Sequence, residues 1–212
     1  MNKQKFLSLS DDEVLNEVKG LLYLFSHQAV IRHGLDRKNE MYPSQSVSEH
    51  IYNMMVLYQY FLPLEDDGND LDRNKSIQLI LWHDIEELET GDIPKHHKTQ
   101  EHEVLANSAF TTKTLQKVPA GLRGTIEEIY EEYEERQTRE SRFVKALDVT
   151  EAAVEDFKAA SKERLFRDSF VTKEDIKLFS NLADVATRDF PCMNRIIQIR
   201  YKNDGECPSP LC

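Results

Sequence analysis

Residues 77–94 read IQLILWHDIEELETGDIP, an apolar run that ends in the adjacent pair His83-Asp84. The apolar residues before the pair predict a buried helix over residues 74–88, central in a helical bundle. An acidic stretch that includes Glu87 follows at once. Charged groups beside a buried helix face are costly unless they are paired or bound to a metal. This stretch therefore predicts an all-α protein with a polar site at the end of a central helix.

Two further potential ligands, His50 and Asp148, lie far from this stretch in the chain. Neutral imidazole suits transition metals and carboxylate suits hard cations, so two histidines and two aspartates fit one Mn, Co, Fe, Zn or Mg ion. Glu87 lies four residues after His83 and three after Asp84, which places it on the same helical face. Four ligands from three helices are a sensible way to fix a metal inside a bundle. A lone histidine or aspartate on a helix is more often a packed or surface residue, so the argument depends on the whole set.

The length and composition are those of one helical domain. At 212 residues the chain is long enough for one sizeable core, so we expect a single domain over residues 1–202 and a flexible tail over residues 203–212. Glycine and proline number only seven each, which disfavours folds rich in turns. The sequence shows no convincing strand and no internal repeat.

Hydrophobic periodicity divides the chain into helices joined by polar segments. Ser10 and Glu13 form a capping-box pattern that opens the first helix. The apolar stripe of this helix consists of Val14, Leu15, Val18, Leu21, Leu22 and Phe25. The predicted helices cover residues 10–25, 46–62, 74–88, 99–117, 122–140, 141–160, 172–185 and 191–201.

The formal net charge of −11 argues against a broad nucleic-acid surface, which needs basic stripes. A small phosphorylated ligand stays compatible, since one metal and a few local cations reverse the field inside a cleft. The three cysteines, Cys192, Cys207 and Cys212, form no CxxC pair, which favours a reducing compartment. No stretch reaches the ~20 apolar residues that a membrane-spanning helix needs, and the first residues do not look like a signal peptide. We therefore expect a cytoplasmic protein that does not associate with membranes.

Three segments, taken in order, carry a resemblance to a known family: Ser46-Val-Ser-Glu-His50, then His83-Asp-Ile-Glu-Glu-Leu-Glu-Thr-Gly-Asp-Ile-Pro94, then Lys145-Ala-Leu-Asp148. They resemble the HD-domain metal-dependent phosphohydrolases. More narrowly, they resemble the branch that contains the bacterial 5'-deoxynucleotidases and their eukaryotic relatives. The resemblance covers roughly residues 21–160.

This resemblance implies an HD-domain helical bundle in which His50, His83, Asp84 and Asp148 bind one divalent metal. Glu87 and Asp92 match the family's acid/base and water- or substrate-orienting carboxylates. The sequence does not divide those two roles between them.

The resemblance also implies a phosphate-binding group. Arg32 matches the arginine that grips the substrate phosphate, with Arg37 as the competing candidate. Lys98 matches a lysine near the phosphate. His33 stands where deoxynucleotidases of this branch carry an aromatic residue that helps select the sugar, which leaves a preference for deoxyribose open.

The implied activity is removal of the 5'-phosphate from (deoxy)nucleoside monophosphates by a homodimer. The same candidate residues are compatible with three other functions: a (deoxy)nucleoside triphosphate triphosphohydrolase, a cyclic-nucleotide phosphodiesterase, and a non-catalytic nucleotide or metal sensor. The few basic residues near the site favour one phosphate over three. His96, His97 and His102 form a second, weaker candidate metal patch.

Overall fold

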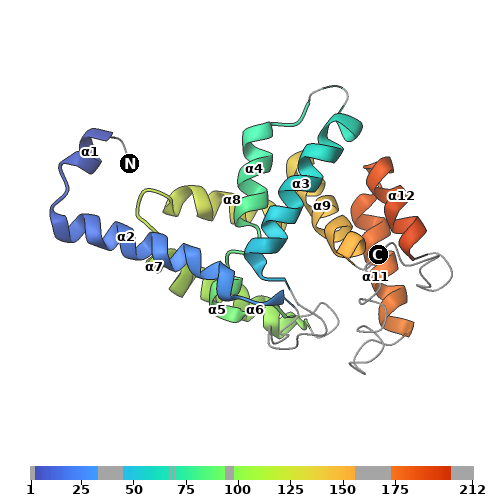
Figure 1. Ribbon diagram of the computed structural model, residues 1–212. Helices are drawn as coiled ribbons and strands as arrows, with labels where there is room; N and C mark the ends of the chain where they lie inside the picture. The colour runs from blue at the N-terminus through green and yellow to red at the C-terminus, as the bar shows by residue number, and fades with distance from the viewer. Residues whose placement is uncertain are drawn as a thin grey trace.

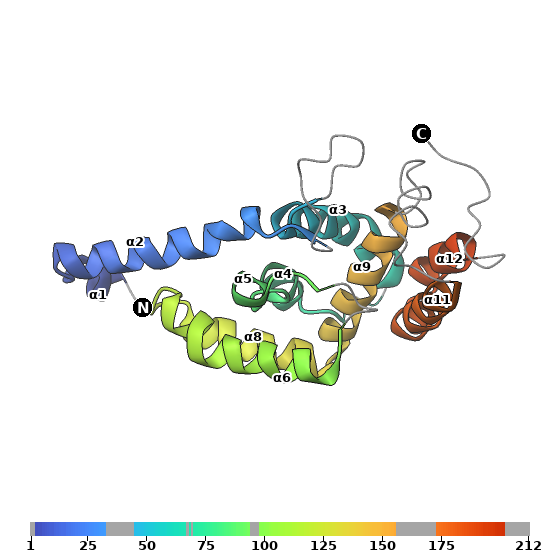
Figure 2. The ribbon, with the colours of Figure 1, turned by 90° about the horizontal axis from the view of Figure 1, so that it is seen from below.

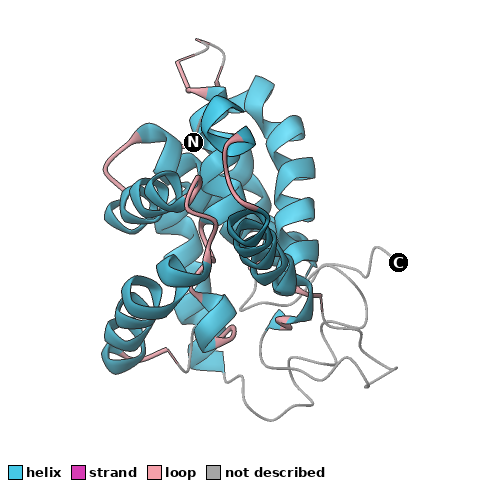
Figure 3. Cartoon of the chain, turned by 90° about the vertical axis from the view of Figure 1, so that its left-hand side faces the viewer, coloured by secondary structure: helices cyan, strands magenta, loops and turns pink. Residues whose placement is uncertain are grey.

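The computed structural model describes residues 3–32, 45–66, 68, 70–93, 98–155 and 173–201 (Figure 1). The regular elements of this part of the chain are helical, and its β-type pairing is a single antiparallel bridge between Ile31 and Ser46 (Figure 3). The all-α architecture predicted from the sequence is confirmed. Among these residues no helix is both long and apolar enough to cross a membrane.

The helices follow the chain with the following bounds. They are α1 (Lys3–Leu7), α2 (Asp11–Phe25), the 3-10 turn η1 (Ser26–Ala29), α3 (Val47–Glu65), α4 (Arg73–Trp82), α5 (Glu87–Thr90), α6 (Gln100–Ala109), the π-helical turn η4 (Phe110–Thr114), α7 (Leu115–Lys117), α8 (Arg123–Glu135), α9 (Arg139–Glu155), α11 (Lys173–Thr187) and α12 (Pro191–Arg200).

Side-chain caps define where several helices begin. The Ser10 hydroxyl accepts from the Glu13 amide and starts α2, as the capping-box pattern predicted. Ser46 forms the same arrangement with Glu49 at the start of α3. Each cap satisfies backbone N–H groups that the first helical turn leaves unpaired. The cap at Ser46 therefore fixes the register of His50 in the first turn of α3.

The predicted helix over residues 74–88 is interrupted, and this was the main error in the sequence-based assignment. α4 ends at Trp82, and residues 83–86 form tight turns before the short helix α5. The amide of Glu87, for example, donates to the carbonyl of Asp84. Adjacent residues on a regular helix point about 100° apart. His83 keeps helical backbone angles at the end of α4, and its Nε2 atom nevertheless lies 3.1 Å from Asp84 Oδ2, because both side chains bend toward the same side.

The described core has three clusters, and the two larger ones meet at Trp82. One cluster joins α3, α4, α8, α9 and α12, with Met54, Leu79 and Phe143 fully buried in it. The other lies between α2, the residues after α4, η4 and α8, and includes Ile85. The Trp82 ring packs against both clusters. The turn at residues 83–86 therefore lies where the two cores join.

Helix α2 packs differently from what its apolar stripe indicates. An amphipathic helix normally turns such a stripe to the core. Here the buried residues of α2 are Gly20 and Leu24. Five members of the stripe are exposed: Leu15, Val18, Leu21, Leu22 and Phe25. A Cβ at Gly20 would lie 2.8 Å from the Pro119 nitrogen, so α2 approaches the segment after α7 through a residue without a side chain.

The remaining differences concern helix ends. α3 continues through Pro63 to Glu65, beyond the predicted end at residue 62. α8 ends earlier than predicted, because Arg136 adopts a left-handed conformation with φ of 53°. Three predicted features lie outside the described residues: the helix end over 156–160, the helix start at Thr172 and the tail over 203–212.

Figure 2 shows how these elements are arranged around the candidate site. Helices α4 and α5 lie between α3 on one side and α8 on the other, and α9 crosses beside them. α11 and α12 lie beyond α9, at the opposite side of the molecule from α2. The turn after α4 is therefore enclosed by helices from distant parts of the chain.

Candidate metal centre

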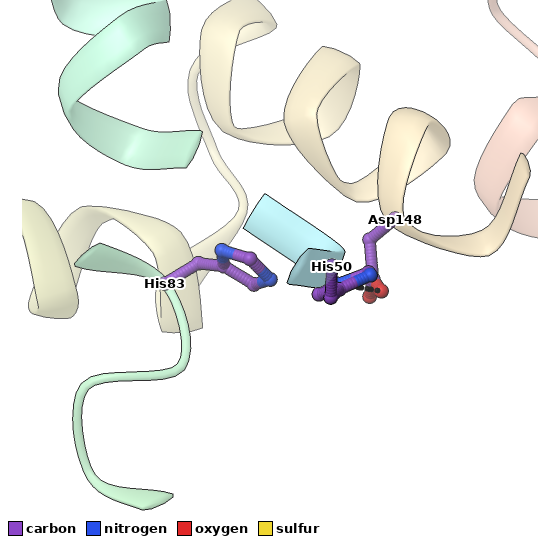
Figure 4. A group of neighbouring side chains, drawn as sticks. All are labelled: His50, His83 and Asp148. Atoms are coloured by element: carbon purple, nitrogen blue, oxygen red, sulfur yellow. Dashed lines mark ion pairs between the residues drawn. The ribbon is translucent and has the colours of Figure 1, made fainter. Parts of the chain in front are cut away.

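The four residues predicted to bind a metal come together from three parts of the fold. His50 projects from the first turn of α3, His83 and Asp84 from the turn after α4, and Asp148 from α9. In Figure 4 the side chains of His50, His83 and Asp148 point toward one another. One ligand atom from each of these three residues lies within 4.8 Å of the other two.

The histidine Nε2 atoms lie close to carboxylate oxygens. His50 Nε2 lies 3.3 Å from Asp148 Oδ1, the pair marked in Figure 4. Asp84 Oδ2 lies 3.1 Å from His83 Nε2 and 3.8 Å from His50 Nε2. The carboxylate of Asp84 thus lies beside both rings, while the residues whose ligand atoms are all mutually close are His50, His83 and Asp148.

The unsatisfied atoms of the two histidines fit a bound cation. His50 and His83 are buried, and although their Nε2 atoms lie beside the carboxylates of Asp148 and Asp84, neither forms a hydrogen bond of acceptable geometry. Their Nδ1 atoms are both engaged, with the Glu151 carboxylate and the Ile80 carbonyl. A buried polar atom without a partner costs about 1–3 kcal/mol. A cation held by both Nε2 atoms and the two aspartates would supply the missing partner, so the donor set fits a divalent metal.

The aspartates are strongly acidic in this setting. Burial acts to raise the pKa of Asp148, but Lys145 and the two imidazoles outweigh it and hold that pKa well below its usual range. Burial opposes ionisation of Asp84 in the same way, and His83 and His50 hold its pKa below the usual value. Ionised carboxylates are the form that binds a cation.

Two neighbouring glutamates have the opposite character. Burial, reinforced by the charge of Asp84, raises the pKa of Glu86 to about 8. Burial and the charges of Asp84 and Asp92 raise the pKa of Glu87 well above its usual value. A carboxyl group with a raised pKa beside ionised carboxylates is typical of a site that transfers protons. Lys98 lies near enough to Glu86 to lower its pKa in part.

Arg32 reaches the same region through the β-bridge. Its backbone N–H donates to the carbonyl of Gln45 at 3.0 Å, which places residue 32 beside the start of α3. Its guanidinium lies 3.4 Å from a carboxylate oxygen of Glu151. Burial acts to lower the pKa of Arg32, but Asp148, Asp84 and Glu151 together raise it above its usual value. Arg32 is thus the largely buried cation facing the predicted ligands, whereas the competing candidate Arg37 and the predicted sugar-contacting His33 lie outside the described residues.

Several residues at the site were not identified from the sequence. Glu151 contacts His50 and Arg32, and Asn53 donates to Glu151 at 2.9 Å. Lys145 and Tyr133 both contact the carboxylate of Asp148. The spacing of Glu151, three residues after a predicted ligand on one helix, is a signal that sequence reasoning could have used. The same spacing relates Lys145 to Asp148 on α9, whereas the contacts of Asn53 and Tyr133 required the packing of separate helices.

Of the second candidate metal patch, only His102 lies among the described residues. His102 lies three residues after the N-cap Thr99, and its Nδ1 accepts from the Thr99 amide at 3.1 Å. This is a capping role at the start of α6. His96 and His97 lie outside the described residues.

The chain matches a known protein family. The family model described as HD domain matches residues 27–184. Human 5'-deoxynucleotidase HDDC2 is 32% identical over 108 residues, which cover 50% of this chain and 50% of that protein. The fission yeast 5'-deoxynucleotidase hdd1 from Schizosaccharomyces pombe is 28% identical over 135 residues, 61% of this chain and 63% of that protein. The chain thus spans about half the length of the curated vertebrate relatives it matches.

The fold also occurs in a solved structure. The crystal structure of a predicted metal-dependent phosphohydrolase from Magnetospirillum magnetotacticum superposes with a TM-score of 0.67. The match covers 89% of this chain and 95% of that one, at 16% sequence identity. At this identity the likeness concerns the fold.

Proposed function

Because the chain belongs to the HD domain family, we propose that it is a metal-dependent phosphohydrolase that removes the 5'-phosphate from (deoxy)nucleoside monophosphates. One observation supports this most directly. Two buried imidazole Nε2 atoms without hydrogen-bond partners face the carboxylates of Asp84 and Asp148, beside the guanidinium of Arg32. A cation site next to a buried arginine is suited to binding a phosphate monoester.

The proposed metal ligands are His50, His83, Asp84 and Asp148. The divalent cation, which is Mn, Co, Mg, Fe or Zn, supplies a Lewis acid that offsets phosphate charge and activates water. Its identity is open, because all of these ions accept mixed nitrogen and oxygen ligands.

The other residues have proposed roles that follow from their charge and surroundings. Arg32 holds non-bridging phosphate oxygens in a two-pronged contact that lysine does not reproduce. Lys98 adds positive charge. For His33, which lies outside the described residues, a contact with the substrate is proposed from the resemblance alone. Glu87 and Asp92 orient the attacking water and deliver a proton to the leaving 5'-oxygen. The raised pKa of Glu87 suits proton donation.

A phosphate-release assay tests the proposal. The purified protein, loaded with Mn²⁺ or Co²⁺, should release inorganic phosphate from nucleoside 5'-monophosphates, and Asp84→Asn should not. Asp189→Asn is the matched control, because Asp189 is exposed and pairs with Arg142 away from the site. If wild type and Asp84→Asn behave alike, the proposed activity is wrong.

The same assay separates the alternative activities. A triphosphohydrolase would release tripolyphosphate from nucleoside triphosphates, and a phosphodiesterase would open cyclic nucleotides. A non-catalytic sensor would bind nucleotide tightly without turnover. Among the described residues, one arginine, Arg32, faces the candidate ligands, which favours a substrate with one phosphate.

We further propose that the protein is a cytoplasmic homodimer with one domain over residues 1–202. The exposed apolar stripe of α2 is a surface that a second copy would cover. Cys192 is an exposed free thiol, which suits a reducing compartment. Sedimentation analysis of the purified protein tests the dimer, and a monomer at micromolar concentration would exclude it. Fractionation of cells that express the protein tests the location.

A further inference from the structure

Glu151 is a carboxylate on α9 whose side chain is only 2% exposed. A buried charge is costly unless it is paired and hydrogen-bonded. Four side chains donate hydrogen bonds to the Glu151 carboxylate. Asn53 Nδ2 donates to Oε1 at 2.9 Å. The other three donate to Oε2: His50 Nδ1 at 2.9 Å, Gln45 Nε2 at 3.3 Å and Arg32 Nη1 at 3.4 Å. The position of the carboxylate is therefore set by contacts from several elements.

The contact with His50 determines which ring nitrogen is available. Because an ionised carboxylate accepts hydrogen bonds and does not donate them, Glu151 favours the neutral His50 tautomer with its proton on Nδ1, which is the tautomer that a cation bound at Nε2 would require. Its Nε2 atom then has a lone pair and no proton. This is the atom that lies 3.3 Å from Asp148 and has no hydrogen-bond partner. A carboxylate behind a metal-binding histidine orients the ring and raises its basicity.

The other predicted histidine ligand has a backbone partner in the equivalent place. His83 Nδ1 donates to the carbonyl of Ile80 at 3.0 Å. This contact holds the same tautomer, but no side-chain substitution removes it. Glu151 is therefore the partner through which the orientation of a ligand ring can be tested.

The same oxygen of Glu151 also holds Arg32. The guanidinium contacts Oε2, which is the oxygen that accepts from His50. Gln45 strengthens the link, because its carbonyl accepts from the Arg32 amide and its side chain donates to Glu151. One carboxylate oxygen thus joins the imidazole predicted to bind metal and the arginine predicted to bind phosphate.

We propose that Glu151 is a positioning residue that holds the imidazole of His50 and the guanidinium of Arg32 in one fixed arrangement. It acts through these two side chains. The proposed effect of Glu151 on His50 requires only that a cation binds at this site. The proposed effect of Glu151 on Arg32 rests on the proposed function. Removing the negative charge should therefore weaken both metal binding and phosphate binding.

Metal binding is tested with Co²⁺ alone, by calorimetry and by the visible absorption spectrum of the bound ion. Glu151→Gln keeps the shape of the side chain and removes its charge. We expect about ten- to hundredfold weaker Co²⁺ binding, the usual effect of losing the group behind a ligand histidine. Unchanged affinity and an unchanged spectrum would overturn the proposal.

Asp66→Asn is the matched control. Asp66 is also a buried carboxylate, and it accepts from the Leu71 amide and pairs with Arg139 away from the site. Its substitution should lower stability and leave Co²⁺ affinity unchanged. If Asp66→Asn weakened Co²⁺ binding as much as Glu151→Gln, the effect would be general destabilisation and the proposal would fail.

Phosphate binding is tested with inorganic phosphate on the Co²⁺-saturated protein, in a double-mutant cycle with Arg32→Ala. If Glu151 acts on phosphate through Arg32, Glu151→Gln should weaken phosphate binding when Arg32 is present and have little effect when it is absent. An equal loss in both backgrounds would contradict the link between the two residues.

A second variant and the activity of the wild type separate failure of the positioning role from failure of the proposed function. If Glu151→Gln does not fold, Glu151→Asp replaces it with the same expectation, since a side chain one methylene shorter draws the carboxylate away from both partners. If the wild-type protein released no phosphate from nucleotides, the proposed function would fail, while the Co²⁺ affinities would still decide the role of Glu151. If the wild type were active and Glu151→Gln bound Co²⁺ normally, only the positioning role would fail.

Discussion

His50 Nε2 and Asp148 Oδ1 lie 3.3 Å apart, although their residues come from α3 and α9. Both side chains are enclosed by the bundle, and the imidazole has no exposed surface. The turn after α4 brings His83 and Asp84 to the same place. The fold therefore brings imidazole and carboxylate groups from separate parts of the chain together in its interior.

Loss of one predicted ligand should abolish metal binding. His83→Ala removes a buried Nε2 atom and should eliminate measurable Co²⁺ binding by calorimetry, together with phosphate release. His102→Ala is the matched control, because His102 lies at the start of α6, where its ring accepts from the Thr99 amide. The control should keep Co²⁺ affinity and lose about 0.5–1.5 kcal/mol of stability, the net contribution of one hydrogen bond. Normal Co²⁺ binding by His83→Ala would contradict the assigned site.

Metal removal should lower the melting temperature. A ligand that binds only the folded state at about 100 times its Kd stabilises it by about 2.7 kcal/mol, which is roughly 5–10 °C for a chain of this size. Thermal unfolding of protein treated with EDTA, followed by addition of Mn²⁺ or Co²⁺, measures this shift. The His83→Ala protein should show no shift. An equal shift in wild type and variant would place the cation elsewhere.

Glu87→Gln should separate chemistry from metal binding. The substitution removes the carboxyl group whose pKa is raised by burial and by the charges of Asp84 and Asp92. We expect kcat to fall by about 10²–10⁴, the usual contribution of a general acid or base. Co²⁺ affinity should stay close to that of wild type. Glu89→Gln provides the control, since Glu89 pairs with Lys117 and Tyr23 instead of facing the site, and full activity of Glu87→Gln would rule out its catalytic role.

Two glycines should respond in opposite ways to the same substitution. At Gly20 a new Cβ would lie 2.8 Å from the Pro119 nitrogen, so Gly20→Ala should cost about 1–3 kcal/mol of unfolding free energy. At Gly124, in the first turn of α8, nothing lies within 4 Å, so Gly124→Ala should be neutral or stabilise by up to about 1 kcal/mol. Denaturant unfolding measures both, and an unaffected Gly20→Ala protein would show that α2 does not approach Pro119 closely.

The set of candidate ligands could be predicted because it depends on residue types in a fixed order. The helical positions of His50 and Asp148 follow from caps and periodicity, whereas the turn that holds His83 and Asp84 does not. The cap at Ser46 and the apolar run before His83 are local signals that the structure retains. Glu151 was missed because its importance arises from contacts with other helices.

The failures also have physical causes. The apolar stripe of α2 indicated a buried face, yet packing depends on what the rest of the chain brings to that helix, and the close neighbour arrives at Gly20. The helix predicted through residue 88 breaks after Trp82. Helix propensity is a weak preference that tertiary packing overrides.

The sequence by itself determined the all-α class, most helix positions and the set of ligand-type side chains, since periodicity, caps and side-chain chemistry are local properties. Only the tertiary structure decided which of those side chains are buried together. It also decided that one carboxylate, Glu151, contacts both His50 and Arg32. Such contacts join residues far apart in the chain, and their distances depend on how helices pack. No local pattern encodes that packing.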